Sequence, residues 1–167
     1  MARETQEPVG TPRWRRLQRD PEAFFATILE MTARAVQTPV AAISIITANR
    51  YQIRFAHGLP PSVEAPCELP FIESPCRHVA EMGRPLIIND VLAHPLVRSS
   101  SLVSDLGIAA YLGEPMHDEN GKSVGSFCVF DRHARDWTED EIRLVSINAV
   151  LVERALNWPD GLTVPDF

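Results

Sequence analysis

The feature that most constrains the fold is a predicted β-hairpin over residues 108–131. Two apolar segments, 108–116 and 123–131, flank the pair Asn120 and Gly121. Asn-Gly is a strong turn signal, because both residues tolerate the positive φ that tight hairpin turns require. The pattern predicts two neighbouring antiparallel strands, around which the rest of the chain has to pack.

A second hairpin is predicted closer to the N-terminus. Residues 39–47 are rich in β-branched side chains, and a turn at residues 48–50 leads to a second strand over residues 51–57. Glycine and proline then interrupt residues 58–70, which we expect to form a loop long enough to cover a pocket. One further strand is expected over residues 85–88.

A long amphipathic helix is predicted towards each end of the chain. The first begins at Asp20-Pro21, where a capping side chain precedes a proline, and runs to about residue 37. The second begins at Thr138, which forms a capping box with Glu141, and runs to about residue 158. Both helices carry apolar residues at helical spacing, so at least one stripe on each should cover the sheet. Periodicity alone leaves open whether the remaining apolar stripe is core or an external interface.

Two shorter helical segments are predicted in the middle of the chain. Ser74-Pro75 combines a cap with a proline and predicts a helix over residues 76–81 that ends near Gly83. A winding segment follows residue 88, and it contains a helical turn over residues 102–106.

Composition is that of a soluble globular domain. The chain has 167 residues, 45% of them apolar and 23% charged, which is enough for one sizeable core. No apolar run approaches the roughly 18 residues needed to cross a bilayer, and the N-terminus lacks a secretory pattern, so we expect a cytoplasmic protein. Three cysteines, Cys67, Cys76 and Cys128, fit free thiols in a reducing compartment better than a disulfide framework.

We expect the chain to consist of a basic N-terminal arm, one domain and a short C-terminal tail. Residues 1–19 hold five arginines against two glutamates, and we expect them to form a basic, flexible arm. Residues 20–158 form the expected domain, and residues 159–167 a C-terminal tail. Because the formal net charge is -6, we expect neither a nucleic-acid partner nor a membrane partner.

An ordered series of short segments carries a resemblance to a known family. The segments are Ser-Pro-Cys-Arg-His-Val at 74–79, Gly-Arg-Pro-Leu-Ile-Ile-Asn-Asp at 83–90, Ala-Tyr-Leu-Gly-Glu-Pro-Met at 110–116, Asp-Glu-Asn-Gly at 118–121, Gly-Ser-Phe-Cys-Val-Phe-Asp at 125–131 and Asp-Trp-Thr at 136–138. Over residues 20–158 the chain resembles a GAF domain, the small-molecule-sensing module of many bacterial signalling proteins.

The resemblance implies an α+β, PAS-like fold. Its central, twisted and mainly antiparallel sheet would carry the N- and C-terminal helices on one face, and pocket-roofing loops and short helices on the other. It also implies parallel homodimers through the terminal helices. We expect the dimer interface to contain these apolar residues: Phe24, Ile28, Met31, Ile142, Val145, Ala149, Val152 and Leu156.

The family also implies a function in signal transduction. No kinase, phosphatase, cyclase or DNA-binding segment is encoded, so we expect a noncatalytic sensor that acts on a separate output protein of one of these kinds. An unidentified small molecule would bind between residues of the roofing segments and the hairpin over residues 108–131. The expected ligand-binding residues are Phe71, Cys76, His78, Asp90, Tyr111 and Cys128.

Several of these residues have a simpler interpretation. Asp90 can cap the segment that follows it, and Cys76 can be a small buried apolar residue. Tyr111 and Cys128 lie on adjacent strands and can face either the pocket or the terminal helices. A pocket filled by its own aromatic residues would favour a ligand-free dimerisation scaffold.

One enzymatic alternative is a thiol-based redox protein of the free methionine sulfoxide reductase type. Cys67 and Cys76 lie near positions where that branch of the family keeps cysteines. However, the branch has a further cysteine, the nucleophile, where this chain has three serines at residues 99–101. Bilin attachment and cyclic-nucleotide patterns are missing or broken, and the histidines and cysteines lack the spacing of a zinc site, so the sequence identifies no cofactor.

Overall fold

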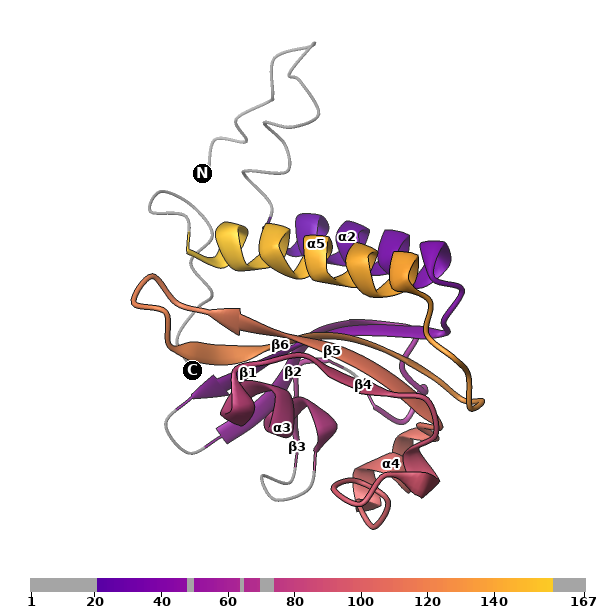
Figure 1. Cartoon of the computed structure of the whole chain (residues 1–167). Helices are drawn as coiled ribbons and strands as arrows, with labels where there is room; N and C mark the ends of the chain where they lie inside the picture. Colours follow the sequence, from indigo (N-terminus) through magenta and orange to yellow (C-terminus); the bar gives the residue numbers. More distant parts are fainter. Residues whose placement is uncertain (1–20, 48–49, 64, 70–73, 158–167) are drawn as a thin grey trace, which may run out of the picture.

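The computed structural model describes residues 21–47, 50–63, 65–69 and 74–157. Its strands form one sheet of six, in the order β3-β2-β1-β6-β5-β4, with every neighbouring pair antiparallel. Helices α2 and α5 lie over one face, and α3 and α4 lie on the other (Figure 1). The elements are α2 (Pro21–Ala35), β1 (Val40–Thr47), β2 (Arg50–His57), β3 (Cys67–Leu69), α3 (Pro75–Met82), β4 (Leu86–Ile88), the 3-10 helix η1 (Val91–Ala93), α4 (Ser101–Leu106), β5 (Ala110–His117), β6 (Ser123–Asp131) and α5 (Glu139–Leu156).

The hairpin predicted from Asn120 and Gly121 is confirmed as β5 and β6. The Asp118 carboxylate accepts hydrogen bonds from the backbone amides of Asn120 and Lys122, both at 2.9 Å. Gly121 has a φ of 77°, a value that L-residues with a Cβ rarely adopt. The turn therefore closes because both the capping carboxylate and the glycine are in the required places.

The hairpin predicted over residues 39–57 is confirmed as β1 and β2, and the loop after it contains one strand that the sequence did not predict. Residues Cys67–Leu69 form β3, which pairs with β2 at the edge of the sheet. A strand of three residues between prolines gives no periodic signal, so we predicted irregular structure there.

The predicted helix caps are confirmed where the structure describes them. Ser74 Oγ accepts from the amide of Cys76 at 3.2 Å, and Gly83 ends α3 in the left-handed conformation. Thr138 and Glu141 form the reciprocal capping box of α5. The expected cap Asp20, the basic arm and the C-terminal tail lie outside the described residues. Within the described part of the chain, no helix is long and apolar enough to cross a membrane.

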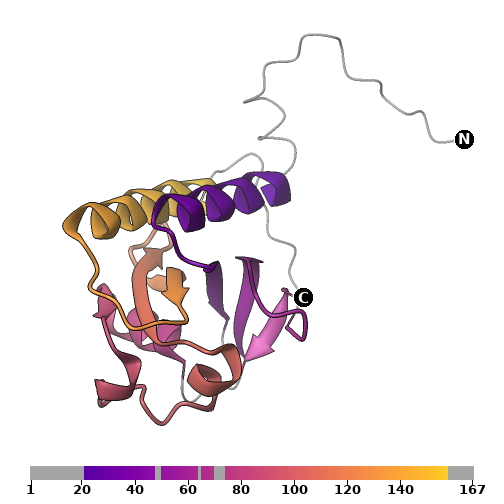
Figure 2. The same cartoon turned by 90° about the vertical axis from the view of Figure 1, so that its right-hand side faces the viewer.

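The alternation of side chains along the strands divides the core into two layers. On β6, Phe127 and Val129 pack under α2 and α5, whereas Cys128 and Phe130 face α3 and α4. Figure 2 shows α2 and α5 side by side over their face of the sheet. Both layers are well buried. The antiparallel sheet with helices on its two faces (Figure 1) confirms the GAF-like arrangement that the resemblance implied.

The burial of the two long helices changes the expected dimer interface. Four of the expected interface residues are at most 8% exposed, because they pack onto the sheet of their own chain: Ile28, Val145, Ala149 and Val152. Phe24, Ile142 and Leu156 are partly buried against the same layer, and Met31 is 64% exposed. The stripe that we assigned to a partner is therefore mainly the one that covers the sheet.

The capping box gives a stability prediction. Replacing Thr138 with alanine removes the hydroxyl that accepts from the Glu141 amide and should lower the free energy of unfolding by about 1 kcal/mol in a denaturant titration. Thr27→Ala is the matched control, because Thr27 is an exposed threonine inside α2 whose hydroxyl donates to the Ala23 carbonyl at 2.8 Å. The control should change the free energy by less than about 0.5 kcal/mol. Equal effects of the two substitutions would contradict the capping assignment.

Candidate functional site

Two thiols meet under the first turn of α3. Ser74 caps the helix and Pro75 occupies its first position, which directs Cys76 onto the sheet. The Cys76 sulfur lies 3.6 Å from the sulfur of Cys128 on β6. The two residues are 8% and 1% exposed. The helix start and the central strand thus place two free thiols in contact inside the core.

Three hydroxyl groups lie around the two sulfurs. Tyr51 comes from β2, Tyr111 from β5 and Ser44 from β1, and all three are at most 1% exposed. Among the described residues, none of these hydroxyls has a partner with good hydrogen-bonding geometry. Buried polar groups are normally paired, so three unpaired hydroxyls beside two thiols are unusual. We call these five side chains the thiol–tyrosine cluster.

The cluster favours a single negative charge on Cys76. A hydrogen bond with Cys128 lowers the pKa of Cys76, burial opposes this, and the nearby hydroxyl groups lower it further. The position at a helix N-terminus acts in the same direction. The hydrogen bond with Cys76, together with burial, raises the pKa of Cys128 well above its usual range. Burial does the same for the pKa of Tyr51 and Tyr111, so both phenols remain protonated.

Gly113 makes room for Tyr111. The two residues lie on the same face of β5, and the tyrosine ring folds over the glycine. A methyl group at position 113 would lie 2.7 Å from Tyr111 Cε1, which is closer than carbon atoms approach. The absence of a side chain at Gly113 therefore determines where the phenol sits.

A small cavity adjoins the cluster. Its volume is about 10 Å³, roughly the space for one water molecule and far below the several hundred Å³ of a typical metabolite pocket. Its walls come from the sheet, α3 and α4. The lining residues are Ala42, Ile53, Ser74, Pro75, Cys76, Leu102, Leu106, Ile108, Tyr111, Cys128 and Phe130.

The structure brings together three of the six predicted ligand-binding residues. Cys76, Tyr111 and Cys128 line the cavity. His78 is half-buried on α3 and does not line it. Asp90 caps η1, where its Oδ1 accepts from the amide of Leu92 at 3.0 Å. Phe71 lies outside the described residues.

Cys67 is not among the residues that line the cavity. Cys67 is half-buried on β3, where burial raises its pKa, and its register partner is Ile53. The described residues contain no group of three or more histidine, cysteine or acidic side chains that could hold a metal.

Sequence reasoning missed Tyr51 and Ser44. The register of β1 with β2 shifts between Ile43 and Ser44, so that Arg54 is an extra residue on β2. This bulge reverses the alternation along β2, with Ile53 facing α3 and Phe55 facing α2. Counting alternate residues cannot place side chains across such a shift, although the β-branched and aromatic composition did identify the strands.

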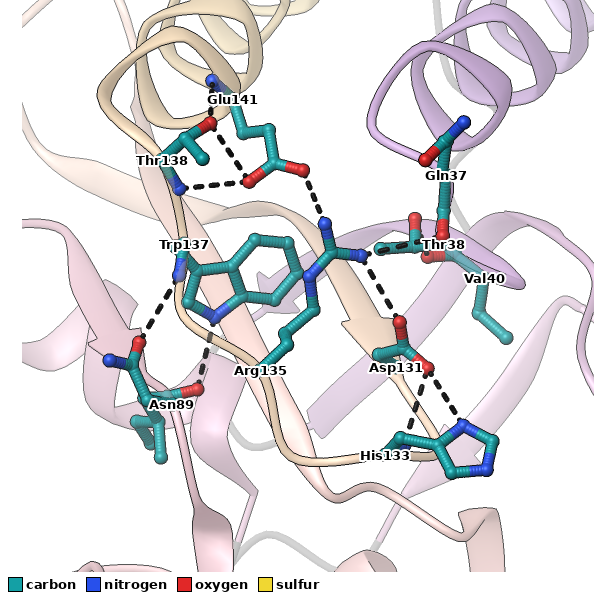
Figure 3. A network of polar contacts seen from close by, with 11 residues as sticks. Gln37, Thr38, Val40, Asn89, Asp131, His133, Arg135, Trp137, Thr138 and Glu141 are labelled. Atoms are coloured by element: carbon teal, nitrogen blue, oxygen red, sulfur yellow. Dashed lines mark hydrogen bonds and ion pairs between the residues drawn. The ribbon is translucent and has the colours of Figure 1, made fainter.

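A polar network joins β6, the end of α2 and the start of α5. The Arg135 guanidinium lies 4.6 Å from the centre of the Trp137 ring and donates to Asp131 Oδ2 at 3.1 Å. It also pairs with Glu141, the second member of the capping box, and contacts the carbonyl of Gln37 at 3.4 Å (Figure 3). One arginine therefore ties three elements of the α2 and α5 side together.

The same network reaches β4, which faces the cluster. The Trp137 indole donates to the carbonyl of Ile88 at 3.0 Å, and the Arg135 amide donates to the carbonyl of Asn89 at 3.0 Å. Ile88 pairs with Tyr111 in the β4–β5 register. Contacts thus run without a break from the thiol–tyrosine cluster through β4 to the first turn of α5.

Solved structures share this fold. A far-red cyanobacteriochrome photoreceptor is 18% identical, with 89% of this chain and 92% of that chain covered at a TM-score of 0.72. The GAF domain of a phosphoenolpyruvate-protein phosphotransferase from Coxiella burnetii is 18% identical, with 84% and 85% covered at 0.69. Free methionine-R-sulfoxide reductase from Neisseria meningitidis, solved with its substrate, is 18% identical, with 81% and 77% covered at 0.63. Identities this low establish the fold only.

Comparison with curated proteins gives no match. The family model of the GAF domain matches residues 20–156, most of the chain and all of the described helices and strands. The order of elements, the sheet and the structural neighbours agree with that match. The chain belongs to the GAF domain family.

Proposed function

We propose that the chain is a noncatalytic sensor domain that receives its signal at the thiol–tyrosine cluster and acts, as a homodimer, on a separate output protein. GAF domains are signalling and sensor modules, and the neighbours include a domain of a two-component sensor histidine kinase from Sinorhizobium meliloti. The observation that carries the proposal is the uninterrupted set of contacts from Tyr111 through Ile88 and Trp137 to the capping box of α5.

The cavity bounds the size of the input. A space of about 10 Å³ accommodates a molecule of only a few atoms. A metabolite would have to displace α3 and α4, whose residues Cys76, Leu102 and Leu106 close the cavity. We therefore propose that the small-molecule ligand expected from the sequence has only a few atoms and binds beside Cys76 and Cys128.

The output surface is proposed to be the outer face of the two long helices. Ile147, Val150 and Leu151 are 53%, 44% and 47% exposed. Their spacing places them on the side of α5 opposite the buried Val145 and Val152, and Met31 is exposed on the neighbouring α2. Apolar side chains gathered on paired helices suit a four-helix interface with a second copy.

A second candidate is a dimerisation scaffold that binds no ligand. It is favoured by the filling of the α3 side with Tyr51 and Tyr111, both fully buried. A scaffold needs no change in the cluster, whereas a sensor requires two arrangements with different affinities for its input or output. A change in self-association when the cluster is chemically modified would therefore distinguish the sensor from the scaffold.

The proposed interface predicts that a charged side chain placed in it weakens self-association. Leu151→Glu should weaken self-association by at least about tenfold, because it places a carboxylate in the apolar contact. Sedimentation velocity over a concentration series measures the dissociation constant. Leu92→Glu is the control, because Leu92 is 74% exposed but lies on η1, away from α2 and α5. A monomeric wild-type protein, or equal weakening by both variants, would contradict the interface.

The small size of the cavity predicts that the purified protein retains no metabolite. Native mass spectrometry should show a dimer whose mass equals two denatured chains, because no metabolite fits in about 10 Å³. A retained metabolite would show that α3 and α4 open in solution, and it would overturn the bound on input size.

A further inference from the structure

We propose that Cys76 and Cys128 form a redox pair that hydrogen peroxide converts to an intramolecular disulfide, with Cys76 as the attacking thiol and Cys128 as the resolving thiol. The two sulfurs are 3.6 Å apart, in van der Waals contact, and both line the cavity. This pairing differs from the Cys67 and Cys76 pair that the sequence suggested. It rests on the proposed function only for its effect on signalling.

Geometry allows the bond with a small movement. A disulfide needs the sulfurs about 2.05 Å apart, so they have to approach by about 1.5 Å. Cys76 lies in the first turn of a helix of eight residues, and Cys128 lies in the centre of the sheet. The sheet is the fixed partner, and we expect α3 to make most of the adjustment.

The surroundings support Cys76 as the attacking group. A thiolate there is stabilised by Cys128, the helix N-terminus and the hydroxyls of Tyr51 and Tyr111. Within the part of the chain that the structure describes, the two phenols have no hydrogen-bond partner in good geometry, so they are available to donate to the sulfur or to the oxygen that leaves. The described cavity is the entry point, and hydrogen peroxide is the common peroxide closest to water in size.

The reaction balances in two steps. The Cys76 thiolate attacks one oxygen of hydrogen peroxide, the O–O bond breaks, and the departing hydroxide takes the proton released by Cys76 and leaves as water. The Cys76 sulfenic acid formed is then attacked by the sulfur of Cys128, and the S–O bond breaks. The second hydroxide leaves as water with the proton of Cys128. Overall, two thiols are oxidised to one disulfide and one peroxide is reduced to two waters.

The first test maps thiols in the full chain after treatment with hydrogen peroxide. Under non-reducing conditions we expect the loss of two hydrogen masses and a linked peptide that contains Cys76 and Cys128. Cys67 should remain open to alkylation and react at least about tenfold more slowly, because burial raises its pKa and its partner in the β2–β3 register is Ile53. Alkylation of Cys76 and Cys128 after treatment, or a link to Cys67, would overturn the proposal.

Two variants separate the roles of the thiols. In the Cys128→Ala variant, oxidation should stop at the Cys76 sulfenic acid, which dimedone traps. The Cys67→Ser variant should still form the disulfide. Circular dichroism establishes whether each variant is folded, and the wild-type peptide map decides the proposal if Cys128→Ala is not. Trapping of sulfenic acid on Cys67 in place of Cys76 would contradict the assignment.

A second peroxide tests the cavity. Cumene hydroperoxide is too bulky for a space of about 10 Å³, so it should oxidise the pair at least about tenfold more slowly than hydrogen peroxide. Equal rates would overturn the cavity as the entry point. Sedimentation of the reduced protein tests the homodimer separately, so failure of the disulfide and failure of the proposed function give different results.

Discussion

Antiparallel pairing of β5 with β6 is the constraint on which the rest of the structure depends. Because successive residues of a strand point to opposite faces, this pairing places Cys128 and Tyr111 on the α3 side and Val129 and Leu112 under α2 and α5. The same register brings Gly113 opposite Cys128, where the missing side chain admits the Tyr111 ring. A shift by one residue would exchange the two faces and separate the thiols.

The two faces are joined at one end of the sheet by Trp137 and Arg135. The indole of Trp137 holds β4 through the Ile88 carbonyl, and Arg135 holds the capping box of α5 through Glu141. The Trp137 and Arg135 side chains are both largely shielded from water. In such surroundings, hydrogen bonds to charged groups contribute more than they do at the surface. The signal that we propose from Tyr111 to the start of α5 would pass through these two side chains.

Local signals in the sequence predicted most of the fold. The Asn120-Gly121 turn, the Ser74 cap and the Thr138 capping box each depend on neighbouring residues, and all three are confirmed. The site depends on contacts between distant residues, which periodicity does not encode. Cys76 and Cys128 are 52 positions apart, and the bulge at Arg54 reverses the alternation that would have indicated Tyr51. Periodicity showed two apolar stripes on α5, and only the family resemblance implied that one of them is external. We assigned Val145 and Val152 to that interface, and their burial places them in the core.

The most direct test of coupling between the cluster and the long helices is the dimer dissociation constant before and after the cluster is oxidised. Sedimentation velocity on the reduced protein and on the protein treated with hydrogen peroxide gives both values under the same conditions. Coupling through Ile88 and Trp137 predicts that the two constants differ by at least about fivefold. Identical constants for the reduced and the disulfide-containing protein would contradict a sensor that signals from the thiol–tyrosine cluster to α5.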